Sequence, residues 1–288
     1  MALQTMPPPI RLLAIDIDGT LLNSQFELSE ANRAAVVAAH HRGTEVVLVT
    51  GRRFSFARRI AAQFQLELTI IASNGALVKS AQGATLARQL LPRQQARAVL
   101  AAAGTYRDNA VLLFDREALG QIVAERLDLT HTPVERYVER NRQYLQQVNR
   151  LEDALTDDPI QVLFMGGVQP MRDLYQRLRV APFVSTITVA RTEYVERDLT
   201  LLDVLDHGCN KGAALARWAA SRGITAEETM AIGDNWNDWE MLEFAGLPVL
   251  MANSAEELKQ KGWAVTSSND ESGVAAAIEK YVLSGPAG

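Results

Sequence analysis

The sequence predicts an α/β protein with a Rossmann-like, doubly wound parallel sheet core and an inserted α+β domain. Three observations support this fold class. Short apolar runs alternate with helical stretches at both ends of the chain, this series stops at Asn74, and it resumes near Lys211. With 288 residues and 31.6 kDa, the chain is long enough for one large domain or two smaller ones.

The N-terminal part has the pattern of a βαβ series. Ser29 can cap the first helix, and Gly43 can end it in a left-handed conformation. A strand, a helix and a second apolar strand in this order imply a right-handed crossover between parallel neighbours. The predicted elements are strands at 12–15, 46–49 and 68–72, with helices at 31–41 and 54–64.

The C-terminal part repeats this pattern and so extends the same predicted sheet. Gly223 and Gly246 follow two of its helices, as glycines at helix ends often do. Ser254 and Glu257 form a capping-box signature for a further helix. The other predicted elements are helices at 211–222, 238–245 and 273–283, with strands at 229–232, 248–251 and 264–266.

The residues between these parts do not continue the βαβ series, and they predict an inserted domain. Their strand candidates lie at 110–114, 160–165 and 184–190, and helix-like segments lie at 93–103 and 170–179. We therefore expect a core made of residues 10–82 and 198–283, and an inserted α+β domain of residues 83–197.

Composition narrows the classes of function. The chain is 48% hydrophobic and 22% charged, as in an ordinary globular protein, and its net charge of -5 gives no basic surface for nucleic acid. Cys209 is the single cysteine, which excludes an intrachain disulfide. No stretch approaches a membrane span, and the N-terminus lacks the pattern of a secretion signal. We expect a cytoplasmic protein without nucleic-acid or membrane partners.

Polar side chains follow three of the predicted strands. They are Asp16 and Asp18, then Thr50 and Gly51, and then Asp234, Asn237 and Asp238. An isolated Asp-x-Asp pair is most often a polar turn or a helix cap. In a parallel sheet, however, these strand ends meet at one edge. Carboxylates gathered there repel each other, and an oxygen-liking cation such as Mg²⁺ relieves that repulsion.

In these residues the chain resembles the haloacid dehalogenase-like hydrolase superfamily, and within it the Cof-type (class IIB) sugar phosphatases. Four motifs stand in the family's order and cover the expected core. They are Asp16-Ile17-Asp18-Gly19-Thr20, Thr50-Gly51-Arg52, Lys211-Gly212, and Gly233-Asp234-Asn235-Trp236-Asn237-Asp238. Asn74-Gly75-Ala76 also matches the branch's pattern. The insertion matches in position and size, which implies a cap domain that closes over the core and sets substrate choice.

The resemblance implies a role for each motif residue. Asp16 would attack phosphorus and form an aspartyl-phosphate, while Asp18 would protonate the leaving oxygen and later deprotonate water. The implied phosphate ligands are the Ile17 and Gly51 amides, Thr50, Lys211 and Asn237. The implied Mg²⁺ ligands are Asp16, Asp18 through its backbone carbonyl, and Asp234. Asp238 is expected in the outer shell of the metal, with direct ligation or a helix N-cap as alternatives.

Together these features predict a Mg²⁺-dependent phosphatase that hydrolyses phosphomonoesters of small metabolites, with sugar phosphates as the expected class. A phosphomutase of the same fold and a non-catalytic, phosphate-binding regulatory protein are the alternatives. A regulatory protein would show a broken motif, and none is broken here. Arg52 and Arg53 can help to bind an anionic substrate or can face solvent in the first turn of a helix.

Overall fold

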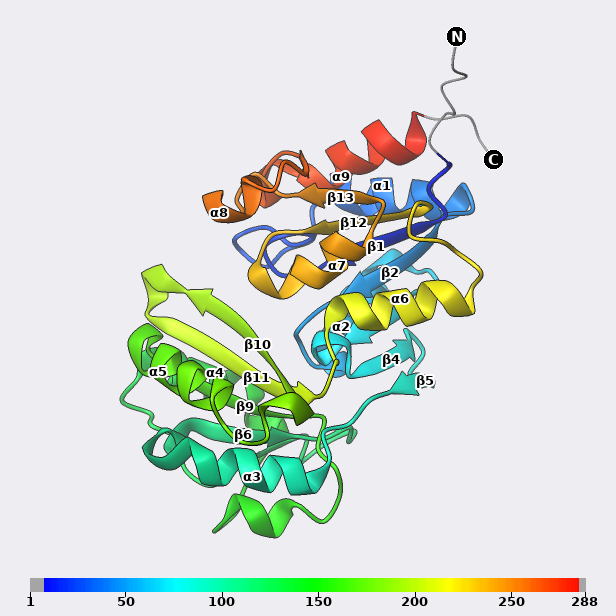
Figure 1. Ribbon diagram of the computed structural model, residues 1–288. Helices are drawn as coiled ribbons and strands as arrows, with labels where there is room; N and C mark the ends of the chain where they lie inside the picture. Colours follow the sequence, from blue (N-terminus) through cyan, green and yellow to red (C-terminus); the bar gives the residue numbers. More distant parts are fainter. Residues whose placement is uncertain (1–7, 285–288) are drawn as a thin grey trace. The chain divides into compact units, whose positions relative to one another are not determined.

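The computed structural model describes residues 8–284 (Figure 1). The chain divides into two compact units, one made of residues up to Ala87 and from Asn210 onward, the other of Arg88–Cys209. Each unit has its own sheet and its own apolar core. Within the described range, no helix is both long enough and apolar enough to cross a membrane.

The first unit is built on an eight-stranded sheet in the order β14-β13-β12-β1-β2-β3-β4-β5. Neighbouring strands from β14 to β3 run parallel, whereas β4 is antiparallel to β3. The strands are β1 Leu12–Asp16, β2 Glu45–Val49, β3 Thr69–Ala72, β4 Leu77–Ser80, β5 Thr85–Arg88, β12 Thr229–Gly233, β13 Leu247–Leu250 and β14 Ala264–Val265. The order places β1 between β2 and β12, at the middle of the sheet.

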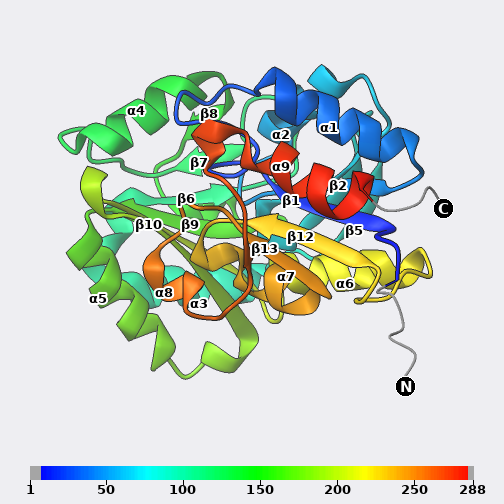
Figure 2. The ribbon, with the colours of Figure 1, turned by 90° about the horizontal axis from the view of Figure 1, so that it is seen from above.

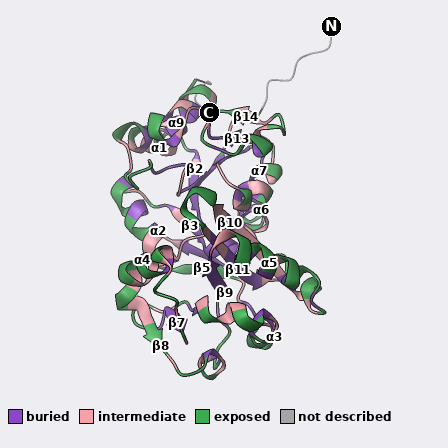
Figure 3. Cartoon of the chain, turned by 90° about the vertical axis from the view of Figure 1, so that its left-hand side faces the viewer, coloured by how far each residue is buried: buried purple, intermediate pink, exposed green. Residues whose placement is uncertain are grey.

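Helices cover both faces of this sheet (Figure 2). Helix α1 lies beside α9 on one face, and α6 lies beside α7 on the other. Because β1 and β2 are covered on both faces, their residues 12–15 and 46–49 form continuous apolar runs, and all of these residues are buried (Figure 3). The helices are α1 Glu30–His41, α2 Phe54–Ala61, α6 Lys211–Ser221, α7 Trp239–Phe244, α8 Glu256–Lys259 and α9 Gly273–Ile278.

Most of the predicted helix ends are found in the structure, but one is wrong. Ser29 caps α1 by accepting a hydrogen bond from the Asn32 amide, and Gly43 follows with a φ of 91°. The capping box predicted for α8 does not form. Its N-cap is Ala255, one residue later than predicted, and the Ser254 hydroxyl has no hydrogen-bond partner among the described residues.

The second unit is an α+β unit around a six-stranded sheet in the order β10-β11-β9-β6-β7-β8. Apolar residues of α3 and α5 join the strands in one core. The elements are α3 Arg93–Ala103, β6 Ala110–Leu113, β7 Ile122–Ala124, α4 Thr132–Asn141, β8 Leu145–Gln147, β9 Gln161–Gly166, α5 Val168–Arg179, β10 Ile187–Tyr194 and β11 Leu199–Asp206. The predicted fold class, a doubly wound α/β core with an α+β insertion, is confirmed.

The boundaries of the two units differ from the expected residues 83 and 197. Strand β11 pairs antiparallel with both β10 and β9, so the second unit continues to Cys209. At the other boundary, β5 remains in the sheet of the first unit, which therefore extends to Ala87.

Candidate functional site

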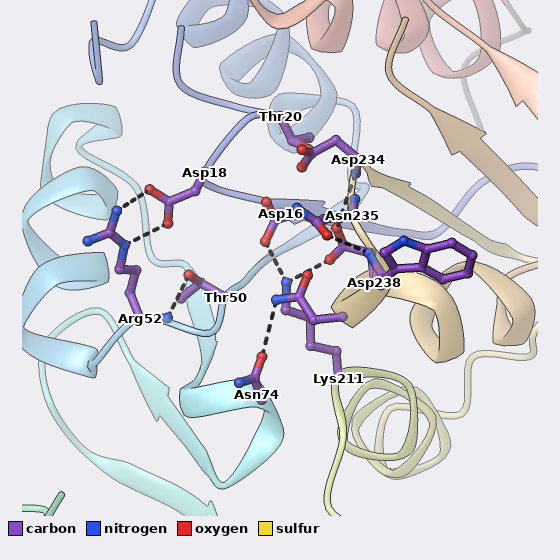
Figure 4. Close-up of polar contacts among 12 residues, drawn as sticks. Asp16, Asp18, Thr20, Thr50, Arg52, Asn74, Lys211, Asp234, Asn235 and Asp238 are labelled. Carbon is purple, nitrogen blue, oxygen red and sulfur yellow. Dashed lines mark hydrogen bonds and ion pairs between the residues drawn. The ribbon is translucent and has the colours of Figure 1, made fainter. Parts of the chain in front are cut away.

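The motif residues lie at the carboxyl ends of three neighbouring strands of the first unit (Figure 4). Asp16 is the last residue of β1, Thr50 directly follows β2, and Asp234 directly follows β12. Because these three strands are parallel and adjacent, their ends meet at one edge of the sheet. The fold thus brings together side chains that are more than two hundred positions apart in the chain.

Lys211 is a buried cation that joins two of the carboxylates. Its Nζ lies 2.6 Å from Asp16 Oδ1 and 2.6 Å from Asp238 Oδ1. Lysine 211 is the first residue of α6, and the Asn210 side chain caps that helix by accepting from the Ala213 amide. Burial opposes the charge on Lys211, but the two carboxylates outweigh it and raise the lysine pKa above its ordinary value.

Asp238 uses both of its carboxylate oxygens on protein donors. While Oδ1 accepts from Lys211, Oδ2 accepts the backbone amides of Asp234 and Asn235, each at 3.1 Å. The close approach depends on Gly233, because a Cβ there would lie 2.7 Å from the Asp238 Cγ atom. Asp238 therefore fixes the loop after β12 and holds the lysine at the same time.

Three carboxylates of the site are crowded. Single oxygen atoms of Asp16, Asp234 and Asp238 all lie within 4.8 Å of one another. Burial and then the Asp238 charge raise the pKa of Asp16 well above its ordinary value and the pKa of Asp234 to about 8. Thr20 partly offsets this by donating a 2.9 Å hydrogen bond to Asp234. A compact set of hard oxygen donors fits a divalent cation such as Mg²⁺.

The turn after β1 is shaped around Asp234. Gly19 has a φ of 78°, in the left-handed region that favours glycine. A Cβ at this position would lie 2.5 Å from Asp234 Oδ2. The turn is also held from the loop after β13, where Asn253 donates a 2.8 Å hydrogen bond to the Gly19 carbonyl. Glycine is therefore required here both by conformation and by space.

Asp18 does not join the carboxylate cluster. Its side chain points away from Asp16 and toward Arg52 (Figure 4). Arg52 donates from Nε to Asp18 Oδ2 at 2.9 Å and from Nη2 to Oδ1 at 2.8 Å, which is a bidentate ion pair. The resemblance implies that Asp18 binds the metal through its backbone carbonyl. The orientation of the side chain toward Arg52 does not affect that implied role.

Three of the expected phosphate ligands, Thr50, Gly51 and Asn237, lie in the segments that follow β2 and β12. The Thr50 hydroxyl accepts a 3.0 Å hydrogen bond from the Arg52 amide. Asn237 donates from Nδ2 to Asn74 Oδ1 at 3.3 Å. A Cβ on Gly51 would lie 3.0 Å from that same Asn74 oxygen. The Gly51 backbone and the Asn237 side chain therefore both lie next to the Asn74 side chain.

Two partnerships in the site were not predicted from the sequence. The first is the Arg52–Asp18 pair, and the second is the bridge that Asn74 makes between the loops after β2 and β12. Ser73 and Asn74 have φ values of 51° and 52°, in the left-handed region, and both are buried. The Asn-Gly sequence at 74–75 was the available signal, because Asn tolerates this conformation better than other non-glycine residues.

A comparison of the sequence with models of protein families finds one that covers most of the chain. The model of the haloacid dehalogenase-like hydrolases matches residues 13–278. The chain belongs to the haloacid dehalogenase-like hydrolase family. The resemblance drawn from the four motifs is thereby confirmed.

Individual relatives match nearly their whole length. Phosphatase YwpJ of Bacillus subtilis is 31% identical over 293 aligned residues, which cover 92% of this chain and 98% of that protein. A haloacid dehalogenase-like hydrolase structure from Bacillus subtilis has a TM-score of 0.80 at 25% identity and covers 93% of this chain and 99% of its own. Another from Bacteroides thetaiotaomicron has a TM-score of 0.77 at 27% identity, with coverages of 94% and 98%. The likeness therefore includes both units.

Proposed function

We propose that this chain is a Mg²⁺-dependent phosphatase that hydrolyses phosphomonoesters of small metabolites, with sugar phosphates as the expected class. The observation that carries the proposal is the buried Lys211, which holds Asp16 at 2.6 Å beside two further carboxylates. Membership of a hydrolase family supports it, as does the likeness to a relative named as a phosphatase. The cytoplasmic location favoured by the sequence stays a prediction.

Asp16 is the proposed nucleophile. One of its oxygens forms a bond to phosphorus while the bond from phosphorus to the ester oxygen breaks, giving an aspartyl-phosphate. Lys211 favours the charged form of Asp16 and fixes its position, so that attack depends mainly on placement. Hydrolysis of the acyl phosphate then breaks the new bond and releases inorganic phosphate.

Asp18 is the proposed general acid and base. In the first step it gives a proton to the departing ester oxygen, and in the second it takes a proton from the attacking water. Both tasks require its carboxyl group to come within hydrogen-bond reach of the reacting oxygen. We therefore infer that Asp18 turns from Arg52 toward the substrate during turnover.

The carboxylate cluster fits Mg²⁺, and the proposed ligands are Asp16, Asp234 and the backbone carbonyl of Asp18. When bound, the ion supplies positive charge that offsets the phosphoryl oxygens. Asp238 is assigned to the outer shell, because both of its oxygens already accept hydrogen bonds from the protein. Lys211 adds a second, permanent positive charge from the protein itself.

The phosphoryl group would be held by Lys211, Thr50, Asn237 and the amides of Ile17 and Gly51. Such preorganised donors stabilise the charge that phosphoryl transfer spreads over the equatorial oxygens. We further propose that the second unit acts as the cap domain of the resemblance, and that its residues set the choice of leaving group.

The direct test is phosphate release from p-nitrophenyl phosphate. We expect turnover with Mg²⁺, a loss of at least about a hundredfold after removal of the ion by EDTA, and recovery when Mg²⁺ is added back. Retention of full activity in EDTA would contradict the metal assignment. Absence of phosphate release from any phosphomonoester in a broad panel would contradict the proposed function itself.

A further inference from the structure

Arg52 lies over two aromatic rings. Its Cζ lies 4.8 Å from the ring centroid of Phe56, on α2, and 6.0 Å from that of Phe26, in the loop after β1. A guanidinium stacked on aromatic faces keeps its donors in a fixed plane. In that plane Arg52 forms the bidentate pair with Asp18. The side chain of Arg52 is 40% exposed and that of Asp18 is 19% exposed, so the pair lies at a surface that solutes can reach.

The loop keeps Phe26 in an uncommon backbone conformation. Phe26 has a φ of 64°, although a bulky residue disfavours the left-handed region. A tight turn holds it there, since the Phe26 amide donates to the Asn23 carbonyl at 2.9 Å and the Asn23 amide donates to the Glu27 carbonyl at 3.0 Å. The ring is nevertheless 41% exposed. The hydrogen bonds of the turn hold this conformation, and it leaves the partly exposed ring beside Arg52.

The proposed chemistry makes the Asp18–Arg52 pair temporary. A general acid must lie about 2.6–3.2 Å from the oxygen that it protonates. In the structure, the Asp18 carboxylate faces Arg52 and not the Asp16 cluster (Figure 4). When Asp18 turns to the leaving oxygen, Nε and Nη2 of Arg52 lose the acceptor that they have in the structure. These two parallel donors match the geometry of a carboxylate or a phosphate.

We propose that Arg52 is a subsite for a second anionic group of the substrate, a carboxylate or phosphate close to the leaving oxygen. The carboxylate of Asp18 holds this place until the substrate arrives. Because the short side chain of Asp18 reaches Arg52 in one orientation and the leaving oxygen in the other, the Arg52 donors lie near that oxygen, and the anion lies within a few bonds of it. This inference rests on the proposed function, and it narrows the substrates to phosphomonoesters with a further negative charge.

The test compares two esters that differ in this charge, 3-phosphoglycerate and glycerol 3-phosphate. In the wild type with Mg²⁺, we expect kcat/KM to favour 3-phosphoglycerate by about tenfold or more, the strength of one charge-assisted bidentate contact. Arg52→Gln should reduce this preference to about one. Arg59→Gln is the matched control, because it removes a cation that also lies near Phe56, from the helix α2 that follows Arg52, and leaves the Asp18 pair intact. It should keep the wild-type preference.

Other outcomes would overturn the inference. An equal loss of kcat/KM for both esters in Arg52→Gln would mean that Arg52 only positions Asp18. A wild-type enzyme that does not prefer 3-phosphoglycerate over glycerol 3-phosphate would exclude the subsite. Arg52→Lys keeps the positive charge but loses the two parallel donors of the guanidinium, so we expect a partial preference for 3-phosphoglycerate. This variant replaces Arg52→Gln if the glutamine variant does not fold. Calorimetric binding of the two esters to Asp16→Asn, with and without Arg52→Gln, measures the same ratio without turnover. Failure of the proposed function alone would abolish hydrolysis of both esters and leave this binding ratio intact.

Discussion

At the scale of single residues, Lys211 connects the parts of the site. It is 1% exposed and lies between Asp16 and Asp238, which are 4% and 0% exposed. A buried ion pair is costly to desolvate, and removal of one partner leaves an uncompensated charge behind. The lysine is therefore expected to contribute to stability as well as to chemistry.

Replacement of Lys211 by Met should lower the free energy of unfolding by about 3–5 kcal/mol, because the buried carboxylates then lack their cation. Urea denaturation at neutral pH, followed by circular dichroism, measures this change. Lys259→Met is the control, since Lys259 pairs with the exposed Glu256 and should cost at most about 0.5 kcal/mol. A Lys211→Met protein as stable as this control would contradict the role given to the buried cation.

The sequence predicted the positions of the motif residues in the fold better than it predicted the orientations of their side chains. Asp16, Thr50 and Asp234 were recognisable because they follow apolar runs at the ends of strands. The orientation of Asp18 was not, because it depends on a side-chain rotamer and on the distance to Arg52 across two loops. Asn74 was noticed as part of a motif, but its contact with Asn237 joins segments that only the fold brings together.

At the scale of elements, the contact between α6 and α7 places the lysine. Gly212 lies against the backbone of Glu240, and a Cβ there would be 2.2 Å from the Glu240 carbonyl oxygen. No side chain fits in that space, so the two helices would have to separate. Since α6 begins at Lys211, any such shift also moves the Nζ atom from its two carboxylates.

Gly212→Ala should therefore reduce stability by about 1–3 kcal/mol through overpacking, and it should lower kcat by tenfold or more through misplacement of Lys211. Thermal denaturation and phosphatase assays measure the two effects. Ala220→Gly, on an exposed position of the same helix, should cost about 1 kcal/mol and leave kcat unchanged. Unchanged kcat in Gly212→Ala would show that the α6–α7 contact does not position the site.

The sequence predicted the longer elements of the first unit and was weaker in the second. The boundaries of α3 were predicted as they are found, because eleven residues with a clear apolar face give a strong signal. Strands β7 and β8 have only three residues each and were not predicted. Helix α4 was also missed, since its apolar face consists of only three residues, Val134, Tyr137 and Val138, of which Val134 alone is buried.

At the scale of the whole molecule, the sequence predicted two units but misplaced the second boundary. The eight residues of β11 include the apolar run Leu201-Leu202, which fits a strand of either sheet. Its assignment to the second unit depends on the hairpin with β10, where Asp198 adopts a φ of 44°. Pairing between strands is a property of the folded chain, and local apolar pattern does not determine it.

The crowded carboxylates make the stability of the whole protein depend on pH and Mg²⁺. The carboxyl of Asp234 has a pKa of about 8 in the fold against an ordinary value of 3.8, so between these values the folded state binds more protons than the unfolded state. Stability of the metal-free protein should therefore fall as pH rises from about 4 to about 8. Mg²⁺ competes with the proton on the Asp234 carboxyl, so the stabilisation of the fold by Mg²⁺ should grow as pH rises over the same range.

Thermal denaturation at pH 6 and pH 8.5, in EDTA and in Mg²⁺, measures this linkage. We expect the increase in Tm caused by Mg²⁺ to be larger at pH 8.5, and we expect Asp234→Asn to lose most of it at both values. An equal or larger increase at pH 6 would contradict the placement of the ion among these carboxylates.

If Asp16 carries the phosphoryl group, a phosphorylated enzyme forms during turnover and can be trapped by rapid quenching. The enzyme is mixed with a ³²P-labelled phosphomonoester and Mg²⁺, quenched in acid within milliseconds, digested, and the labelled peptide is mapped. We expect an acid-stable, hydroxylamine-sensitive label on Asp16 that is absent from Asp16→Asn. Rapid hydrolysis with no label on the protein, or a label on another residue, would contradict it.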